Sequence, residues 1–317
     1  MIRVLLLGSF FLAVACGPTP DPTSLIVKPR IIGATYAVDG APERASARPG
    51  ESVRVEFLLT QKEEPVQNTW AIIVCRPAAT AFGIGFCEEG DPLTFAIGAT
   101  PTLDAPSFVV DVPEGPAEDL LFIGAVCMGG QVNLDINMDA AMEITNPCVD
   151  EGVGQLVTGS VFVAEEERDN LSPGIAEVRF NDEVWTAEPE ELSGCEGLDM
   201  PQIRTGTADE HTIEVDPVPG SREPFLDESF DPPVATNEDL PVAFYATDLG
   251  ISNLFSVIDA EPGATAFEAT PTAEITYVTE EIEDPVEAGG RVVRFEIVMR
   301  DDRGGMDRVT RALCLLP

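Results

Sequence analysis

The chain has few basic side chains. Its 317 residues include 18 Lys and Arg, only two of them Lys, and a single His, against 56 Asp and Glu, which gives a formal net charge of −38. Proteins that bind nucleic acid gain most of their affinity by neutralising phosphates with Lys and Arg. We therefore expect no nucleic-acid partner.

Apolar runs long enough to cross a membrane are missing after the first fifteen residues, since a spanning helix needs about 20 consecutive apolar residues. The chain still has 44% hydrophobic and only 23% charged residues, which is enough apolar material for packed cores. We expect a folded body that lies outside the bilayer.

Catalytic signatures are absent as well. The sequence has no Gly-x-Ser-x-Gly, no Gly-x-x-x-x-Gly-Lys-Ser/Thr and no His-Glu-x-x-His. His211 stands at the edge of an expected strand, where a surface role is the simpler interpretation. Paired carboxylates would suffice for glycoside hydrolysis. Because the chain has so many acidic residues, the sequence does not point to any particular pair. We expect no catalytic residue and no cofactor.

Turning to what is present, the N-terminus has the layout of a secretory signal peptide. Arg3 precedes an apolar stretch from Val4 to Val14, and small residues follow. The segment from Leu12 to Cys16 resembles the lipobox of bacterial lipoproteins, although Ala13 stands where that family most often has Leu. The resemblance implies that residues 1–15 are removed and that Cys16 is lipidated. The alternative is that Cys16 pairs in a disulfide after cleavage elsewhere.

Residues 16–25 are expected to form a tether, because three prolines follow Cys16 without apolar periodicity. Two or more acyl chains on Cys16 would give a stable membrane anchor. Gly17 is not the Asp that marks inner-membrane retention in enteric lipoproteins. By that resemblance we expect the outer membrane of the cell envelope, at its periplasmic face or at the cell surface.

An even number of cysteines remains after Cys16, as expected for disulfides in an exported protein. If no bridge crosses between domains, Cys195 pairs with Cys314. The first four allow three pairings. We favour those that close loops of turn-forming residues, Cys75 with Cys87 and Cys127 with Cys148.

The strand pattern predicts an all-β chain. In Ser52 to Leu59 the apolar residues occupy alternate positions, the period of a half-buried strand. Similar short segments recur between Gly, Pro and Asp residues, as is typical of β-sandwiches. In the first half the other candidates are 26–33, 69–76, 107–112, 120–127 and 155–163. In the second half they are 175–185, 211–215, 241–246, 273–279, 291–300 and 308–315.

Two domains are expected from the length and from an acidic break near residue 167. We place a first β-sandwich at 26–166, a linker at 167–173 and a second β-sandwich at 174–317. Helical periodicity is scarce, and the best candidate is Asp139 to Thr145, next to Pro147.

The mature chain also resembles a group of surface lipoproteins of myxobacteria. The matching stretches are Pro29–Ile31, Pro49–Val53, Ala125–Gly130, Asn170–Trp185, Val298–Asp307 and Thr310–Cys314. The resemblance implies two immunoglobulin-like β-sandwiches on a lipid tether, and it implies no activity.

Metal sites are not expected. Structural zinc needs close Cys pairs such as Cys-x-x-Cys with His support, but the chain has no such pair and His211 is its only His. Asn133, Asp135, Asn137 and Asp139 alternate as calcium ligands do, but Met138 replaces the required Gly and Ile144 the terminal Glu. The carboxylates from Glu280 to Glu287 resemble a solvated hairpin loop, and Asp301, Asp302 and Asp307 resemble turn formers.

The sequence thus predicts a lipid-anchored cell-envelope protein without enzymatic activity, which serves as a binding or scaffold module for a protein or glycan partner. Trp70 and Trp185 are expected in the sandwich cores rather than at a sugar site. The alternatives are a carbohydrate-active hydrolase on a β scaffold and a calcium-stabilised adhesion module.

Overall fold

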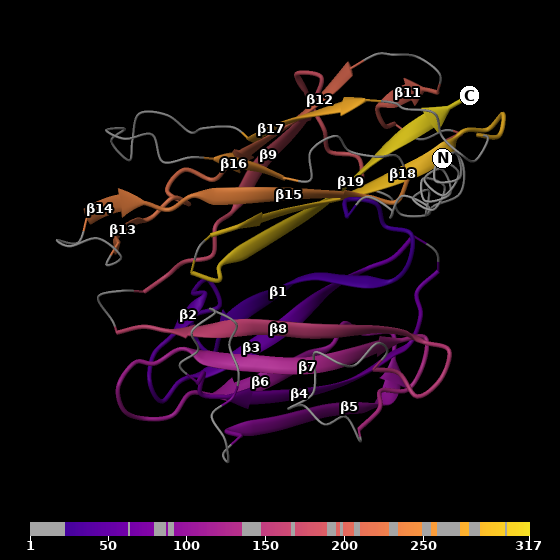
Figure 1. Cartoon of the computed structure of the whole chain (residues 1–317). Helices are drawn as coiled ribbons and strands as arrows, with labels where there is room; N and C mark the ends of the chain where they lie inside the picture. The colour runs from indigo at the N-terminus through magenta and orange to yellow at the C-terminus, as the bar shows by residue number, and fades with distance from the viewer. Residues whose placement is uncertain are drawn as a thin grey trace, which may run out of the picture.

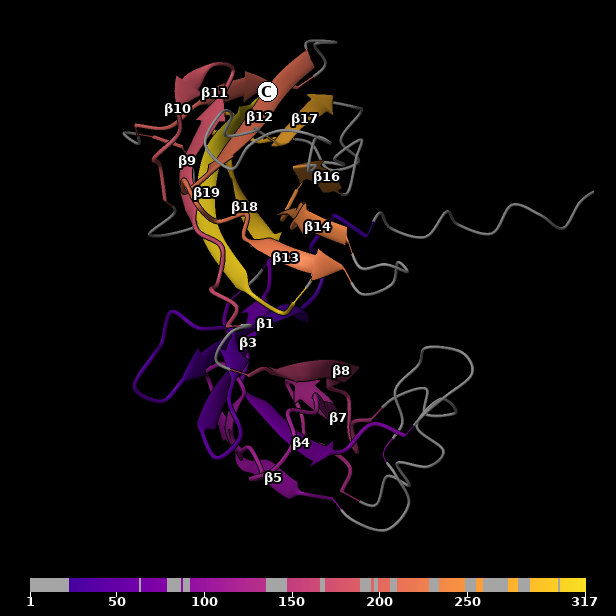
Figure 2. The ribbon, with the colours of Figure 1, turned by 90° about the vertical axis from the view of Figure 1, so that its left-hand side faces the viewer.

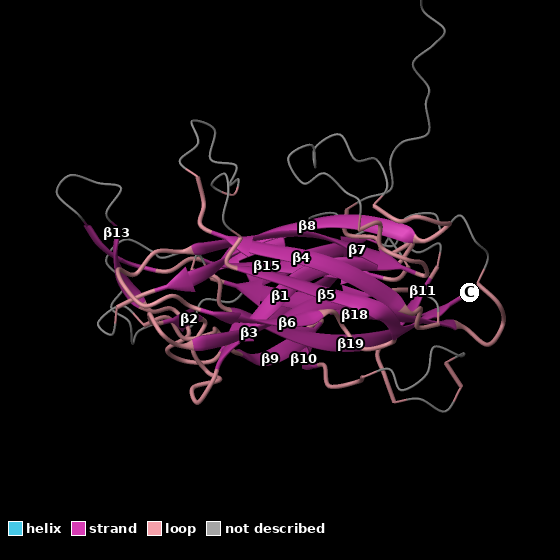
Figure 3. Cartoon of the chain, turned by 90° about the horizontal axis from the view of Figure 1, so that it is seen from below, coloured by secondary structure: helices cyan, strands magenta, loops and turns pink. Residues whose placement is uncertain are grey.

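The computed structural model describes residues 23–62, 64–78, 87, 92–134, 147–165, 169–188, 195–196, 199–205, 210–227, 234–248, 255–258, 273–278, 286–301 and 303–317. Within these ranges every regular element is a strand (Figure 3). No helix in the described part of the chain is long and apolar enough to cross a membrane. The strands form two bodies, one above the other in Figure 1.

The first body is a sandwich of two antiparallel sheets. One sheet has the order β1 (Arg30–Val38), β3 (Ser52–Thr60), β6 (Ser107–Asp111). The other has the order β2 (Ser46–Ala47), β8 (Val153–Val163), β7 (Leu120–Met128), β4 (Asn68–Cys75), β5 (Thr94–Thr102), in which only the short β2 pairs in parallel.

The core of this sandwich follows the alternation seen in the sequence. Val53, Val55 and Phe57 of β3 all point inward and are nearly inaccessible. Phe57 and Phe122 meet edge to face, with ring centroids 5.7 Å apart, the geometry that aromatic pairs prefer. Trp70 joins the same cluster, as expected from the sequence.

The second body repeats this topology, with one short strand added at the edge of its first sheet. One sheet has the order β10 (Glu183–Val184), β9 (Ile175–Phe180), β12 (Glu210–Pro217), β17 (Ala273–Val278). The other has the order β11 (Gln202–Arg204), β19 (Met306–Leu316), β18 (Arg291–Arg300), β15 (Leu240–Ala246), β16 (Phe255–Ile258). The hairpin of β13 (Pro224–Asp227) and β14 (Val234–Asn237) is separate.

Both bodies have immunoglobulin-like strand order. In immunoglobulin letters, each sandwich has strands A, B and E in one sheet and A′, G, F, C and C′ in the other, with A′ parallel to G. The chain is therefore all-β with two immunoglobulin-like sandwiches. The change from one sandwich to the other falls between Val163 and Ile175, the interval that contains the expected linker at 167–173.

The two sandwiches share an apolar joint, which lies between β1 and the β18–β19 hairpin in Figure 2. Its members come from both bodies and are buried, namely Ile26, Ile32, Leu58, Ala243, Tyr245 and Val298, with Met306 against them. Ile32 reaches the joint through a β-bulge in β1, which skips one residue between Ile31 and Gly33. The bulge turns Ile31 toward the sandwich core and Ile32 toward the second sandwich.

Hydrogen bonds and ion pairs surround the apolar joint. Arg294 donates to the Gln61 carbonyl, and Arg300 donates to the Ile32 carbonyl. Lys62 lies 3.5 Å from Asp248. The first sandwich, from residue 24 to 166, has a net charge of −14, and the chain from 167 to 317 has −24. Cations at the joint therefore oppose the repulsion between two acidic bodies.

The linker is held on both sides. The Asn170 backbone N–H donates to the Ser46 hydroxyl at 2.8 Å, and its side-chain amide donates to the Asp301 carboxylate at 3.0 Å. Asp301 also accepts from the N–H groups of Arg303 and Gly305, at 2.8 and 2.7 Å. Asp301 is thus a turn former, as expected from the sequence. Asp302 lies outside the described residues.

Candidate functional site

The strands of the larger sheet in the first sandwich carry no charge. None of the residues of β4, β5, β7 and β8 is Asp, Glu, Lys or Arg, although 23% of the whole chain is charged. One face of these strands fills the sandwich core. The other face points away from it, and there an antiparallel sheet usually carries polar residues.

The strand register brings apolar side chains together on this outer face. Across the sheet, Phe95 lies beside Ile73, Ile73 beside Ile123, and Ile123 beside Thr158. In the adjacent row, Ile97 lies beside Ala71, and Leu156 closes the row on β8. We call the set of Ala71, Ile73, Phe95, Ile97, Ile123, Leu156 and Thr158 the uncharged face.

Several members of the uncharged face are open to solvent. Phe95 is 55% exposed, Ile97 42% and Leu156 37%. Phe95 and Ile97 lie on β5 and Leu156 on β8, with the half-buried Ala71, Ile73 and Ile123 of β4 and β7 between them. Apolar side chains grouped on one surface are typical of a contact site, whereas single ones are not. The uncharged face is therefore the candidate functional site.

Two disulfides lie at opposite ends of this face. Cys75 and Cys127 lie on the outward side of β4 and β7, and β4 and β7 run in opposite directions. Cys75 bonds to Cys87 and Cys127 to Cys148, while Cys195 bonds to Cys314 in the second sandwich. These three pairs coincide with the pairs expected from the sequence.

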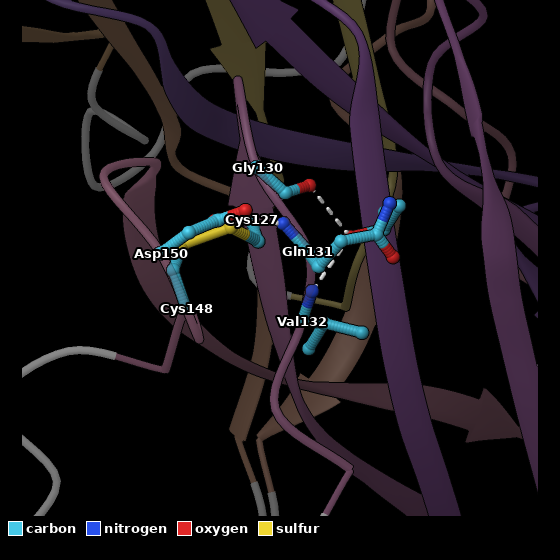
Figure 4. The surroundings of a disulfide bond; sticks show 7 residues. Cys127, Gly130, Gln131, Val132, Cys148 and Asp150 are labelled. Carbon is cyan, nitrogen blue, oxygen red and sulfur yellow. Dashed lines mark hydrogen bonds between the residues drawn. A yellow bond between two sulfur atoms is a disulfide. The ribbon is translucent and has the colours of Figure 1, made fainter.

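Figure 4 shows the surroundings of the Cys127–Cys148 disulfide. The Thr69 hydroxyl donates to the Gly130 carbonyl at 3.0 Å and accepts from the Val132 N–H at 2.7 Å. Asp150 accepts from the Gln131 N–H at 3.0 Å. Together with the disulfide, these bonds hold the segment after β7 against the sheet, where Val132 and Cys148 cover Ala125.

A cavity of about 400 Å³ adjoins the face where β8 meets the second sandwich. Tyr36, Gln155, Thr158, Arg300 and Met306 are among its lining residues. Burial raises the pKa of Tyr36 well above its ordinary value, so this phenol stays protonated and can serve as a hydrogen-bond donor or acceptor.

Glu238 is a carboxyl whose pKa would suit acid–base chemistry. Burial raises its pKa to about 7, against the lowering effect of the Arg303 guanidinium, and such a value suits a general acid. Its side chain is completely buried, however, and Arg303 holds it at 2.5 Å. Arg303 also binds Glu223 at 3.0 Å. The two ion pairs of Arg303 hold the β18–β19 turn in place and leave no space for a substrate beside Glu238.

The other singled-out residues have structural surroundings. Trp70 packs over Gly98 of β5, where a Cβ would lie 2.2 Å from the indole nitrogen. Trp185 is 1% exposed and donates to the Ala312 carbonyl at 2.8 Å. His211 stacks on Phe180 and lies 3.0 Å from Asn181. Asp307 accepts from the Ile175 N–H at 2.7 Å.

Several expectations fall on residues that are not described. They include Cys16 with the signal peptide, most of the tether, Asp135 to Asp139, the expected helix at Asp139 to Thr145, and Glu280 to Asp284. Within the described ranges, no group of three or more His, Cys, Asp or Glu side chains is arranged to hold a metal ion.

Comparisons with known proteins give little information beyond the strand order described above. No family model matches the chain, and no curated protein matches it. Among solved structures, it is similar to Salmonella alpha-2-macroglobulin reacted with methylamine, at 12% identity and a TM-score of 0.23 over 92% of this chain. It is also similar to DIP-gamma IG1+IG2, at 7% identity and a TM-score of 0.20, covering 92% of this chain and 98% of that one.

The chain spans only 15% of the length of the macroglobulin. At these TM-scores neither likeness bears on function, and the immunoglobulin-like assignment depends on the strand order of the two sandwiches.

Proposed function

We propose that the protein is a lipid-anchored module of the cell envelope that binds a protein partner through the uncharged face and has no enzymatic activity. The observation that carries this proposal is the exposed apolar side chains of Phe95, Ile97 and Leu156, on a sheet whose strands β4, β5, β7 and β8 have no charged residue. The lipobox ending at Cys16 supplies the anchor.

The chemistry of the face favours a protein partner over a glycan. Sugars are bound by carboxylate and amide groups that reach their hydroxyls, together with aromatic rings. The uncharged face offers one exposed ring, Phe95, and one hydroxyl, Thr158, with aliphatic side chains around them. A partner with an apolar surface of its own matches this composition better.

Anchoring and binding are tested separately. Wild-type protein should partition into detergent and carry an acylated N-terminal Cys16 by mass spectrometry, whereas Cys16→Ala should partition into the aqueous phase. An unmodified N-terminus in the wild type would remove the anchor from the proposal. For binding, Ile97→Asp should lose partners that the wild type retains from native envelopes, while Val109→Asp, on the opposite sheet, should keep them.

A further inference from the structure

We infer that the cavity between β1, β8 and the β18–β19 turn is a binding site for a small organic carboxylate, an ionised acid group carried on a short apolar body. The cavity borders the uncharged face at Leu156 and Thr158. Its ligand is nevertheless different from the protein partner proposed for that face, so the inference goes beyond the proposed function. The carboxylate group occurs in free organic acids and at the C-terminus of a peptide, and the test below separates these two sources.

The cavity lies along a part of β8 that has a strand on one side only. β8 pairs with β7 from Val153 to Val161, whereas on its other side, among the described residues, it pairs with β2 only at Phe162 and Val163. The cavity is lined by β8 between Gln155 and Gly159, by β1 and by the β18–β19 turn. Its volume of about 400 Å³ lies within the range of about 300 to 1,000 Å³ that is usual for small-ligand sites.

One cation lines the cavity without an anionic partner. Arg300 is half-buried and donates to the Ile32 carbonyl, and within the described ranges it forms no ion pair. Asp301 lines the cavity as well, but its oxygens already accept from the N–H groups of Arg303 and Gly305 and from the Asn170 amide. The guanidinium of Arg300 is therefore the charged group of the cavity that still lacks a partner.

Two hydroxyl groups face the same cavity from different strands, Tyr36 from β1 and Thr158 from β8. Neither has a hydrogen-bond partner in the part of the chain that the structure describes. Burial raises the pKa of Tyr36, so its phenol keeps the proton that it can donate. The Gln155 amide, by contrast, is engaged at both ends by the Ile31 backbone.

The open polar groups of the cavity can thus all donate hydrogen bonds. A carboxylate accepts at both of its oxygens, and its two oxygens match the fork of an Arg guanidinium. Hydroxyl donors on either side of that fork add further hydrogen bonds to the charged group. The three donors therefore favour a carboxylate over a ligand that must itself donate.

The rest of the lining is largely apolar and suits an apolar body. It includes the core rings Phe57 and Phe122, together with Leu156 and Met306. The chain has a net charge of −38, which repels an anion in general. An acid should therefore bind here only because Arg300 offsets that repulsion, and its affinity should depend strongly on this side chain.

The test is a calorimetric titration of the mature lipoprotein in a mild detergent with phenylacetate, and with phenylacetamide as the uncharged probe of similar shape. The wild type should bind phenylacetate saturably at one site and phenylacetamide at least tenfold more weakly. Arg300→Gln should weaken the binding of phenylacetate at least tenfold, because hydrogen bonds to charged groups are the strong ones.

Tyr36→Phe is the second variant, and it should weaken the binding of phenylacetate about tenfold. It removes only an oxygen that has no partner among the described residues, so its unfolding temperature should equal that of the wild type. This variant keeps the inference testable if Arg300→Gln loses stability together with its bond to Ile32.

Arg54→Gln is the matched control. It removes the same charge from an exposed position on β3, outside the cavity, and should bind phenylacetate like the wild type. Ile97→Asp, on the uncharged face and also outside the cavity lining, should do the same, which separates this site from the proposed protein-binding surface.

The peptide acetyl-Ala-Ala-Phe, with a free or an amidated C-terminus, identifies the source of the carboxylate. Binding of the free form that is tighter than that of phenylacetate assigns the site to peptide ends, and weaker binding assigns it to free acids. The inference is overturned if neither acid binds saturably, if acids and amides bind equally, or if Arg54→Gln weakens binding as much as Arg300→Gln.

Discussion

Ile31 and Ile32 are adjacent in sequence, and their side chains lie in two different apolar clusters. Ile31 belongs to the core of the first sandwich, and Ile32 to the joint with the second. Adjacent residues of a strand point to opposite faces in any case, and the β-bulge at this point of β1 shifts that alternation by one residue, so that Ile31 shares the inward side with Ala34 and Val38 while Ile32 points outward. The two residues therefore allow the core and the joint to be perturbed independently.

Ile32→Ala should uncouple the two sandwiches. Removing the side chain from a buried site should cost about 2 to 4 kcal/mol, and the loss falls on the joint. Calorimetry should then show two unfolding transitions where the wild type shows one. Ile31→Ala, the control, should lower stability by a similar amount without separating the transitions, and a single transition in both variants would contradict this role for Ile32.

Gln155→Leu should destabilise the first sandwich. The Gln155 side chain accepts from the Ile31 N–H at 2.8 Å and donates to the Ile31 carbonyl at 3.0 Å, so it joins β8 of one sheet to β1 of the other. Losing both hydrogen bonds should lower the free energy of unfolding by about 1 to 2 kcal/mol. Urea denaturation measures this, and unchanged stability would show that solvent replaces the bridge.

Stability should fall as pH rises from about 4.5 to about 7, because of Glu238. The pKa of this carboxyl is raised to about 7 in the folded chain, so in this interval the folded state binds more protons than the unfolded state. Glu238→Gln should flatten the dependence over that interval. The measurement is the unfolding free energy as a function of pH, and a wild-type curve that rises through this interval would refute the assignment.

Below that interval, the stability should fall as the pH falls. Although burial alone would raise it, Arg44 and Arg48 hold the pKa of Glu51 below its ordinary value, and a hydrogen bond from Arg48 lowers that of Asp169. The stability that these pairs provide is present at neutral pH and is lost as pH falls below about 4. Arg48→Gln should reduce the acid sensitivity in the same titration.

Removing the Cys195–Cys314 disulfide should cost more than removing Cys75–Cys87. The first closes 119 residues and the second 12. Loop-closure entropy then gives about 5 and about 3 kcal/mol, respectively. Chemical denaturation of the two double-alanine variants tests the order, and the reverse order would mean that local packing dominates.

Much of the fold follows from the local pattern of the sequence. Val53, Val55 and Phe57 alternate as a half-buried strand does, and they form the core of the first sandwich. The cysteine pairs follow from the turn-forming residues of the loops that they close and from the domain division. The shared topology of the two sandwiches, by contrast, depends on long-range pairing that no local pattern contains.

The candidate site was not predicted. The strand β5, which carries Phe95 and Ile97, contains Gly98 and Pro101, and both residues argue against a strand. The available signal was β7, where neither face carries a polar side chain. Such a strand is covered on both sides, and in the structure the outward Leu121, Ala125 and Cys127 are indeed buried, which leaves Ile123 as the half-buried outward residue of β7.

The joint could not be predicted either. Asn170 and Asp301 are 131 residues apart, and their hydrogen bond depends on how the sandwiches meet. The bulge that turns Ile32 outward leaves no mark in the apolar pattern, because Ile31 and Ile32 are the same residue type. The turn-forming role of Asp301 follows from the sequence, but its contact with Asn170 of the linker depends on the three-dimensional arrangement of the sandwiches.

The path of the chain just before β1 has a mechanical consequence. The Ala246 carbonyl accepts from the Ile26 N–H at 2.7 Å, and the Ala246 N–H donates to the Ser24 carbonyl at 2.9 Å, so the entering segment lies parallel to the end of β15. A pull on residue 23 would act along this pairing and load both hydrogen bonds in shear. Force from an attachment point upstream would thus reach the second sandwich before it stretched the first.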